Sequence, residues 1–377
     1  MREFLMVLLT AAVVTYLATP LVRRLALVVG AITAVRDRDV HTVPIPRLGG
    51  VAMLVGFAAA VLLGSQLPYL GQLFDTSPQL YGVLVAAAII TLLGAVDDVR
   101  ELDWMTKLAG QVIAGGVMAF FGVQLLSLPI GGVTVLPEPV MVTLTILVVV
   151  VSTNAVNVID GLDGLAAGVV LISASAFFGW SYLVSTNFDP PNVFSMATFI
   201  SAALIGVCAG FLPHNFHPAR LFMGDAGALL LGLLLAAATI SMTGSVDPNS
   251  SLASASAAAA ILLPLAIPVA IMALPFLDIL LAVFRRTRAG QLPWKPDRGH
   301  LHHRLLDIGH SHRRAVVLLY LWSALVAIGA VSFAYLPAWA SVVGILFLLV
   351  VAILLTRRPW GAGSDPRPAV SSHGPTL

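Results

Sequence analysis

The sequence has little charge and almost no cysteine. Only 10% of its 377 residues are Asp, Glu, Lys or Arg, whereas soluble domains carry about 25%. The apolar share of 59% is more than a soluble fold of this size can bury, which excludes a soluble enzyme or binding domain. A single cysteine, Cys208, excludes an intrachain disulfide, and its apolar surroundings predict a small buried side chain.

The chain also lacks a recognisable cleavable signal peptide. Its first apolar run has no small-residue cleavage site, so we expect a retained membrane span. The runs do not alternate apolar and polar residues, and each has about the 20 residues that a spanning helix needs. We therefore predict an all-α polytopic membrane protein with about eleven transmembrane helices. The expected spans are 4–22, 49–67, 80–96, 107–121, 138–156, 164–184, 193–211, 225–243, 257–284, 315–335 and 338–356.

Lys and Arg are missing from every second loop. They follow spans one, three, seven, nine and eleven, and the loops after spans two, four, six, eight and ten have none. Only Arg2 lies on the other side. Since cytoplasmic loops carry the excess of Lys and Arg, the odd-numbered spans should end in the cytoplasm and the N-terminus should lie outside.

Five aspartates lie at the edges of apolar runs: Asp97 and Asp98 after span three, Asp160 and Asp163 after span five, and Asp225 before span eight. Carboxylates near the hydrocarbon core are unfavourable, which makes them candidates for function. The same alternation places all five on the cytoplasmic side. We expect the active site on that face.

Two cytoplasmic segments suggest phosphate and cation chemistry. In DDVRELDWMTKLAGQ, the adjacent Asp97 and Asp98 can share a cation or act on a phosphate proton, and Lys107 begins the next helix, where phosphate is favoured. A solvated charged turn is the alternative. The loop VHTVPIPRLGG is extended by its prolines, and its paired glycines allow close backbone approach. An ordinary charged connector is the alternative there.

Two further segments supply oxygen ligands. In NAVNVIDGLDGLAAG, Asn154, Asn157, Asp160 and Asp163 follow one another at intervals of three, which would line one helix face. In LFMGDAGALLLG, Asp225 begins a helix. It can cap that helix and also bind Mg²⁺, which prefers one or two carboxylates together with substrate phosphates.

The longest loop, RRTRAGQLPWKPDRGHLHHRLLDIGHSHRR, is rich in Arg and His. A zinc site is one interpretation, but the loop has no cysteine and its arginines disfavour a cation. Phosphate capture suits Arg forks and His donors better. Anionic lipid headgroups are the alternative partner.

These segments together resemble the polyprenyl-phosphate N-acetylhexosamine-1-phosphate transferase family (glycosyltransferase 4 family). The matching segments are VHTVPIPRLGG, the DD-to-KLAGQ segment, NAVNVIDGLDGLAAG, LFMGDAGALLLG and PDRGHLHHRLLDIG, in the family's order. The resemblance implies a Mg²⁺-dependent reaction in which a polyprenyl phosphate attacks the β-phosphate of a UDP-N-acetylhexosamine and UMP leaves. The PDRGHLHHR segment is similar to the bacterial undecaprenyl- or decaprenyl-phosphate branch that uses UDP-GlcNAc to start cell-wall polymers or surface glycans.

The resemblance also implies roles for individual residues. Asp225 would be the main metal ligand with support from Asp98, and Mn²⁺ could replace Mg²⁺. Asp97 would be the base toward the lipid phosphate, and Asp160 and His300 would complete the catalytic set. The expected substrate-binding residues are Lys107, Asn157, Asp163, Arg286, Arg298, His302 and His303.

Other functions stay open at this point. Within the family, the donor could be another UDP-HexNAc or UDP-MurNAc-pentapeptide, and a covalent aspartyl-phosphate route could replace direct attack. A transporter would spread its charges through the membrane depth and show a repeat. Here the charges gather at one face and no repeat is evident. A scaffold without chemistry would not need the intact acidic motifs.

We expect one transmembrane catalytic domain over residues 1–356 and a disordered cytoplasmic tail over 357–377, which is rich in Pro, Gly and Ser. The expected location is the bacterial cytoplasmic membrane. Expected partners are UDP-GlcNAc, the polyprenyl phosphate, membrane lipids and, as in relatives, a second copy of the chain, but no nucleic acid.

Overall fold

The computed structural model describes residues 1–32, 44–125, 137–187, 195–243, 284, 287–288, 290 and 305–357. Apart from one isolated bridge between Ile32 and Pro46, the regular elements in these ranges are helices. They are α1 (Arg2–Val29), α2 (Gly49–Gly64), α3 (Gln72–Thr76), α4 (Gln79–Arg100), α5 (Trp104–Phe120), α6 (Glu138–Ile159), α7 (Leu165–Asn187), α8 (Ser195–Asn215), α9 (Gly224–Thr243), α13 (His312–Tyr335) and α14 (Ala338–Arg357).

Eight of these helices are long and apolar enough to cross a membrane: α1, α4, α6, α7, α8, α9, α13 and α14. Helix α2 is a shorter apolar helix, and the short α3 belongs to the connection between α2 and α4. The predicted all-α polytopic membrane architecture is therefore confirmed.

Ten of the eleven predicted spans coincide with a helix of the structure. The ninth, 257–284, falls outside the described residues except for its last position, so the count of eleven remains a prediction. Helix α1 is longer than the predicted span 4–22. It continues through Arg23 and Arg24 to Val29, and Gly30 then caps it in the left-handed conformation (φ 79°) common at helix C-termini.

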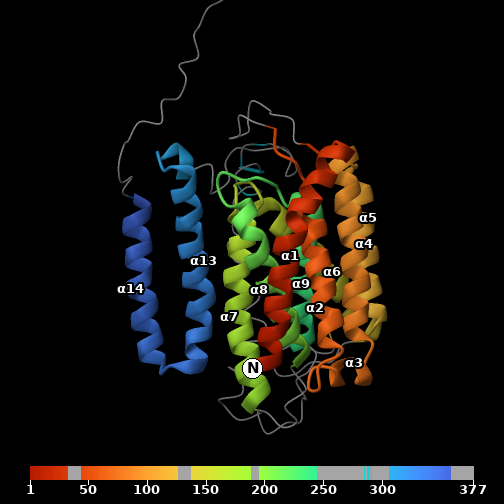
Figure 1. Cartoon of the computed structure of the whole chain (residues 1–377). Coiled ribbons are helices and arrows are strands. Elements are labelled where there is room, and N and C mark those ends of the chain that lie inside the picture. The colour runs from red at the N-terminus through yellow and green to blue at the C-terminus, as the bar shows by residue number, and fades with distance from the viewer. Residues whose placement is uncertain are drawn as a thin grey trace, which may run out of the picture.

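Helix α9 forms the centre of the bundle and is the most deeply buried of the candidate spans. It packs against α2, α4, α6 and α8, while α1 covers α2 and α8 (Figure 1). Helix α13 packs on α7, and α14 packs on α13, so this pair stands at one side of the bundle. The lone cysteine, Cys208, is buried within α8, as predicted.

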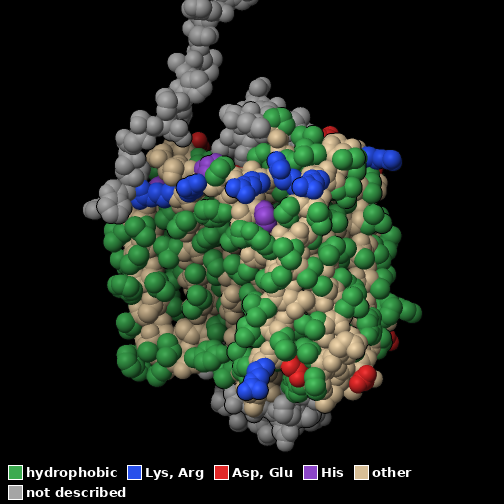
Figure 2. Space-filling view, in the orientation of Figure 1, with side chains coloured by type: hydrophobic (Ala, Val, Ile, Leu, Met, Phe, Trp, Pro, Cys, Tyr) green, Lys and Arg blue, Asp and Glu red, His purple; other side chains and the backbone are tan. Residues whose placement is uncertain are grey.

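Polar groups gather at one end of this bundle. On the face that Figure 2 shows, Lys and Arg side chains form a band near the end opposite to the chain's N-terminus, with apolar side chains below it. The C-terminal ends of α4 and α6 and the N-terminal ends of α5 and α9 meet at this end. Its contacts include a hydrogen bond from Arg23 Nε to the carbonyl of Arg220 at 3.0 Å.

Candidate functional site

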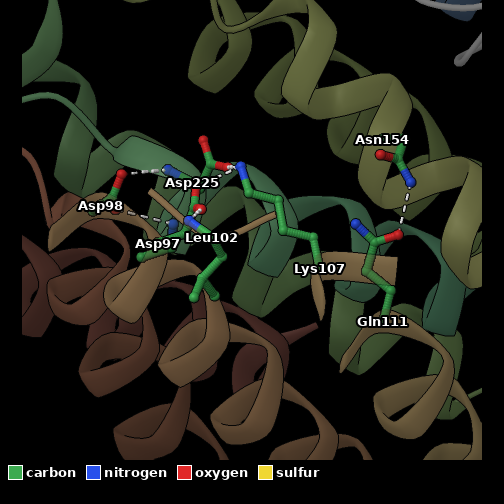
Figure 3. A network of polar contacts seen from close by, with 8 residues as sticks. Asp97, Asp98, Leu102, Lys107, Gln111, Asn154 and Asp225 are labelled. Carbon is green, nitrogen blue, oxygen red and sulfur yellow. Dashed lines mark hydrogen bonds and ion pairs between the residues drawn. The ribbon is translucent and has the colours of Figure 1, made fainter. Parts of the chain in front are cut away.

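Three helix ends bring Asp97, Lys107 and Asp225 together. Asp97 lies on the last turn of α4, Lys107 on the first turn of α5, and Asp225 at the start of α9. Lys107 Nζ lies 2.5 Å from Asp97 Oδ2 and 2.8 Å from Asp225 Oδ2 (Figure 3). The structure thus joins two carboxylates that are 128 positions apart in sequence through one ammonium group. Such a group marks a place where a positive charge is stabilised.

Asp98 is engaged differently from its neighbour Asp97. Its Oδ1 accepts the backbone N–H of Asp225 at 3.0 Å, and its Oδ2 accepts that of Ala226 at 3.2 Å. The first N–H groups of a helix have no partner within the helix, and an acidic side chain satisfies them well. Asp98 therefore caps α9 from a different helix and fixes the position of Asp225.

This cap requires glycine at position 224. Gly224 has φ +67°, and a Cβ there would lie 2.2 Å from Asp98 Oδ2. A larger residue would therefore be strained and would also displace the carboxylate. This contact explains why glycine precedes Asp225 in FMGDAG.

The turn between α4 and α5 sets the directions of Asp97 and Lys107. Glu101 ends α4 in the left-handed region (φ 49°), and Asp97 Oδ1 accepts the backbone N–H of Leu102 at 2.6 Å. Asp103 then caps α5 by accepting the N–H groups of Met105 and Thr106. As a result, Lys107 starts from the first turn of α5 and reaches back to the end of α4.

Asp160 follows α6 and belongs to the same electrostatic cluster. Burial, together with the negative charges of Asp225 and Asp98 and against a lowering by Arg47, raises the pKa of Asp160 to about 8. Asn157 lies half-buried on the last turn of α6, and its carbonyl accepts the Asp160 N–H at 3.3 Å. The third acidic segment of the sequence therefore reaches the group formed by Asp98 and Asp225.

Asp163 lies in a second cluster. Its Oδ2 lies 2.8 Å from His217 Nδ1 and accepts the N–H of Ala219 at 3.0 Å. Its backbone N–H donates to His312 Nε2 at 3.1 Å, and the rings of His217 and His312 stack at 4.3 Å. Ligand atoms of the three side chains lie within 4.8 Å of one another. This cluster ties the loop of Asp160 to the loop before α9 and to the start of α13.

Residues with no assigned role in the sequence also contribute to this end of the bundle. Gln111, one turn beyond Lys107, accepts a hydrogen bond from Asn154 Nδ2 at 2.7 Å and so joins α5 to α6 (Figure 3). Arg47 interacts electrostatically with Asp98 and Asp160. The spacing of Lys107 and Gln111 in KLAGQ indicates that Gln111 lies on the same helix face as Lys107, because positions four apart share a face. Nothing in the sequence around His217 indicates its contact with Asp163.

Five of the predicted site residues belong to the long loop before α13. Arg286, Arg298, His300, His302 and His303 lie outside the described residues. The phosphate-capture role of that loop therefore remains a prediction. His310 and His312, at its end, are described, and both are buried.

The donors at the Asp97–Asp225 end suit a hard divalent cation. They are carboxylate oxygens, which Mg²⁺ prefers, whereas the Asp163 cluster offers imidazole nitrogens that suit softer metals. Asp97 and Asp225 already hold one cationic group between them. Both oxygens of Asp98 accept N–H groups, although each keeps a second lone pair. The residues present thus fit Mg²⁺.

Known proteins of one family resemble this chain. The profile of a family described as "Glycosyl transferase family 4" matches residues 80–243, which include Asp97, Asp98, Asp160 and Asp225. The decaprenyl-phosphate N-acetylglucosaminephosphotransferase of Mycolicibacterium smegmatis is 46% identical over 363 residues, which cover 95% of this chain and 89% of that protein.

More distant relatives carry related names. The probable undecaprenyl-phosphate N-acetylglucosaminyl 1-phosphate transferase of Bacillus subtilis is 32% identical, with 92% of this chain and 88% of that protein covered. The undecaprenyl-phosphate alpha-N-acetylglucosaminyl 1-phosphate transferase of Escherichia coli strain K12 is 28% identical, with 90% and 87% covered.

Proposed function

Since the chain belongs to the glycosyl transferase family 4, we propose that it transfers GlcNAc-1-phosphate from UDP-GlcNAc to a polyprenyl phosphate in the membrane. Relatives that this chain matches over almost nine-tenths of their length are named as N-acetylglucosamine phosphotransferases that act on decaprenyl or undecaprenyl phosphate, and these names support the reaction. The observation that carries it is the junction of Asp97, Lys107 and Asp225 at one end of a membrane bundle. A soluble nucleotide sugar and a lipid phosphate can meet at such an end.

The reaction exchanges one phosphoanhydride for another. An oxygen of the lipid phosphate attacks the β-phosphorus, which carries the sugar. The bond from that phosphorus to the bridging oxygen of the α-phosphate breaks, and UMP leaves with the electron pair. Polyprenyl-diphospho-GlcNAc remains in the bilayer. Because both reactants are anions, the site must reduce their repulsion and stabilise the charge on the phosphoryl group.

Asp225 and its neighbours would hold Mg²⁺. We assign Asp225 as the main ligand, with Asp98 in support, since Asp225 Oδ2 already holds a cationic group and Asp98 accepts the backbone N–H of Asp225. Bound Mg²⁺ would neutralise phosphate oxygens and lower the repulsion between donor and acceptor. Lys107 supplies a second positive charge from the start of α5, where phosphate is also favoured by the helix N-terminus.

We assign proton transfer to Asp97. Its Oδ1 is fixed by the Leu102 N–H, and its Oδ2 faces Lys107. When Lys107 moves toward a phosphate, Oδ2 becomes able to accept the proton of the lipid phosphate. Asp98, which caps α9, positions Asp225 in this scheme. Asn157 and Asp160 would hold the nucleotide diphosphate, and Asp163 would support substrate binding from the adjacent cluster.

The acidic end of the bundle indicates how the protein would lie in the membrane. The acidic end would face the cytoplasm of a bacterial inner membrane and the N-terminus would lie outside, because Lys and Arg gather at the acidic end. Residues 1–356 would form one catalytic domain and 357–377 a cytoplasmic tail. Light scattering on the purified protein would test the homodimer that the resemblance implies.

An exchange assay tests the function. Purified protein is incubated with polyprenyl phosphate, Mg²⁺ and each of several UDP-sugars, and UMP release is measured. We expect release with UDP-GlcNAc. Preference for another UDP-HexNAc would correct the donor, and no release with any of them would contradict the proposed function. Omitting Mg²⁺, or replacing it by Mn²⁺, tests the cofactor.

A further inference from the structure

An arginine outside the acidic motifs is held against the carboxylate cluster by the loop between α1 and α2. Arg47 is half-buried, and its positive charge acts on both Asp98 and Asp160. Lys107 acts on the other two carboxylates, Asp97 and Asp225. The chain thus places one cation by each pair.

Backbone hydrogen bonds fix Arg47 in this place. Its own N–H donates to the carbonyl of Ala31 at 2.9 Å. On one side of it, Pro46 accepts the N–H of Phe222 at 2.9 Å, and on the other, Gly49 donates to the carbonyl of Phe222 at 2.9 Å. Gly50 donates to Met223 at 3.0 Å. The segment 46–50 is therefore joined to the two residues that precede Gly224 and Asp225.

The backbone beside Arg47 is strained. Leu48 has φ 89°, in the left-handed region that a Leu rarely adopts, and its side chain is buried. Next to it, Gly50 packs so closely on α9 that a Cβ would lie 2.1 Å from Gly227 N. Such strain persists only where the surroundings enforce it, and it is concentrated at functional sites. The strained segment places Arg47 beside the two residues that precede Gly224 and Asp225.

The charges in the cluster indicate what Arg47 does. Asp97, Asp98, Asp160 and Asp225 would repel any phosphate that approaches, and a divalent cation together with Lys107 offsets only part of this repulsion. An arginine presents a planar fork that binds two phosphate oxygens at once and stays protonated throughout. We propose that Arg47 is a substrate-binding residue whose guanidinium holds a phosphate group of the reactants beside Asp98 and Asp160.

This proposal rests on the proposed function, and it deepens it by adding a phosphate ligand from the first cytoplasmic loop. The phosphate can belong to the nucleotide diphosphate or to the lipid. Arg47 transfers no proton in either case. The two sources predict different changes, which one set of variants distinguishes.

The test uses the full-length protein and the variants Arg47→Gln and Arg47→Lys, with Arg24→Gln as the control. Arg24 is an exposed arginine in the C-terminal part of α1, the helix that precedes the loop of Arg47. Two quantities are measured: the Mg²⁺-dependent affinity for UDP relative to uridine by calorimetry, and the KM for each substrate. Lys keeps the charge without the fork, so Arg47→Lys also preserves the fold if Arg47→Gln does not.

If Arg47 holds the nucleotide diphosphate, Arg47→Gln should weaken UDP binding about tenfold or more and leave uridine unchanged, as expected for the loss of hydrogen bonds to a charged group. If it holds the lipid phosphate, the KM for polyprenyl phosphate should rise by a similar factor. Arg47→Lys should show a smaller effect of the same kind, and Arg24→Gln none. The proposal is overturned if both Arg47 variants keep the wild-type affinity for UDP and the wild-type KM for each substrate to within about twofold. An inactive wild type that still binds UDP would count against the proposed function alone.

Discussion

Asp98, on the last turn of α4, accepts the backbone N–H of Asp225, at the start of α9, at 3.0 Å. This bond connects two acidic motifs that are far apart in the sequence. It makes the position of the proposed metal ligand depend on the end of another helix.

Replacing Asp98 by Asn should therefore disturb α9 as well as catalysis. An Asn offers one acceptor and one NH₂ group, and the NH₂ would face a backbone N–H of Asp225 or Ala226. We expect a loss of about 1–3 kcal/mol in the free energy of unfolding and at least a tenfold loss of UMP release. Thermal melting in detergent and the exchange assay measure these changes. Asp75→Asn, at an exposed position of α3, is the control; equal behaviour of the two variants would contradict the capping role.

Gly224→Ala should be strongly impaired. The new Cβ would meet Asp98 Oδ2 at 2.2 Å, and φ +67° is unfavourable for alanine. We expect the turnover rate to fall more than about tenfold, because the Cβ displaces the carboxylate that positions Asp225. Gly116→Ala, in α5, has open space around its Cβ and should be neutral or slightly stabilising. A Gly224→Ala enzyme with normal turnover would show that the close contact has no functional weight.

Lys107→Met should change the response to Mg²⁺. Removing the ammonium leaves Asp97 and Asp225 without the cation that now lies between them. We expect Mg²⁺ to stabilise this variant against thermal unfolding at lower concentrations than the wild type, since Lys107 no longer competes for the carboxylates. Turnover should nevertheless fall, because the contact from Lys107 to phosphate is lost. A melting temperature that responds to Mg²⁺ as in the wild type would argue against a shared cation site.

Asp160 should make the stability of the metal-free protein depend on pH. Burial raises its pKa in the folded state to about 8 from the ordinary value of 3.8. Between these values the folded state keeps a proton that the unfolded state has lost, so the stability from this group decreases as pH rises from about 4 to about 8. Asp160→Asn carries no titrating group and should flatten this decrease. Melting temperatures of both proteins across this range, without divalent metal, give the comparison. Parallel pH profiles of the two proteins would contradict a raised pKa of Asp160 in the folded state.

The sequence predicts the helical architecture and much of the acidic end. Long apolar runs are a strong signal because no water is available to the backbone inside a membrane, so helices satisfy the hydrogen bonds. The alternation of basic loops placed the five aspartates on one side, and the structure brings Asp97, Asp98 and Asp225 into contact through Lys107 and the α9 N-terminus.

Other relationships depend on tertiary packing, which no local pattern encodes. The three-residue spacing of Asp160 and Asp163 predicted one shared helix face. However, α6 ends at Ile159, and the chain then turns Asp163 toward His217 and His312. Similarly, the role of Arg47 depends on a segment that pairs with residues 222–223, more than 170 positions away. Hydropathy and motif spacing carry no information about either contact.

In our proposal, the Asp97–Lys107–Asp225 end of the bundle performs Mg²⁺-dependent transfer of GlcNAc-1-phosphate. The most direct measurement compares UMP release by the wild type, Asp225→Asn and Asp75→Asn, with UDP-GlcNAc and polyprenyl phosphate over a range of Mg²⁺ concentrations. We expect normal release by the wild type and Asp75→Asn, and a loss of at least about a hundredfold in Asp225→Asn at every Mg²⁺ concentration, because Asp225 would hold the ion. Near-normal, Mg²⁺-dependent release by Asp225→Asn would contradict the proposal.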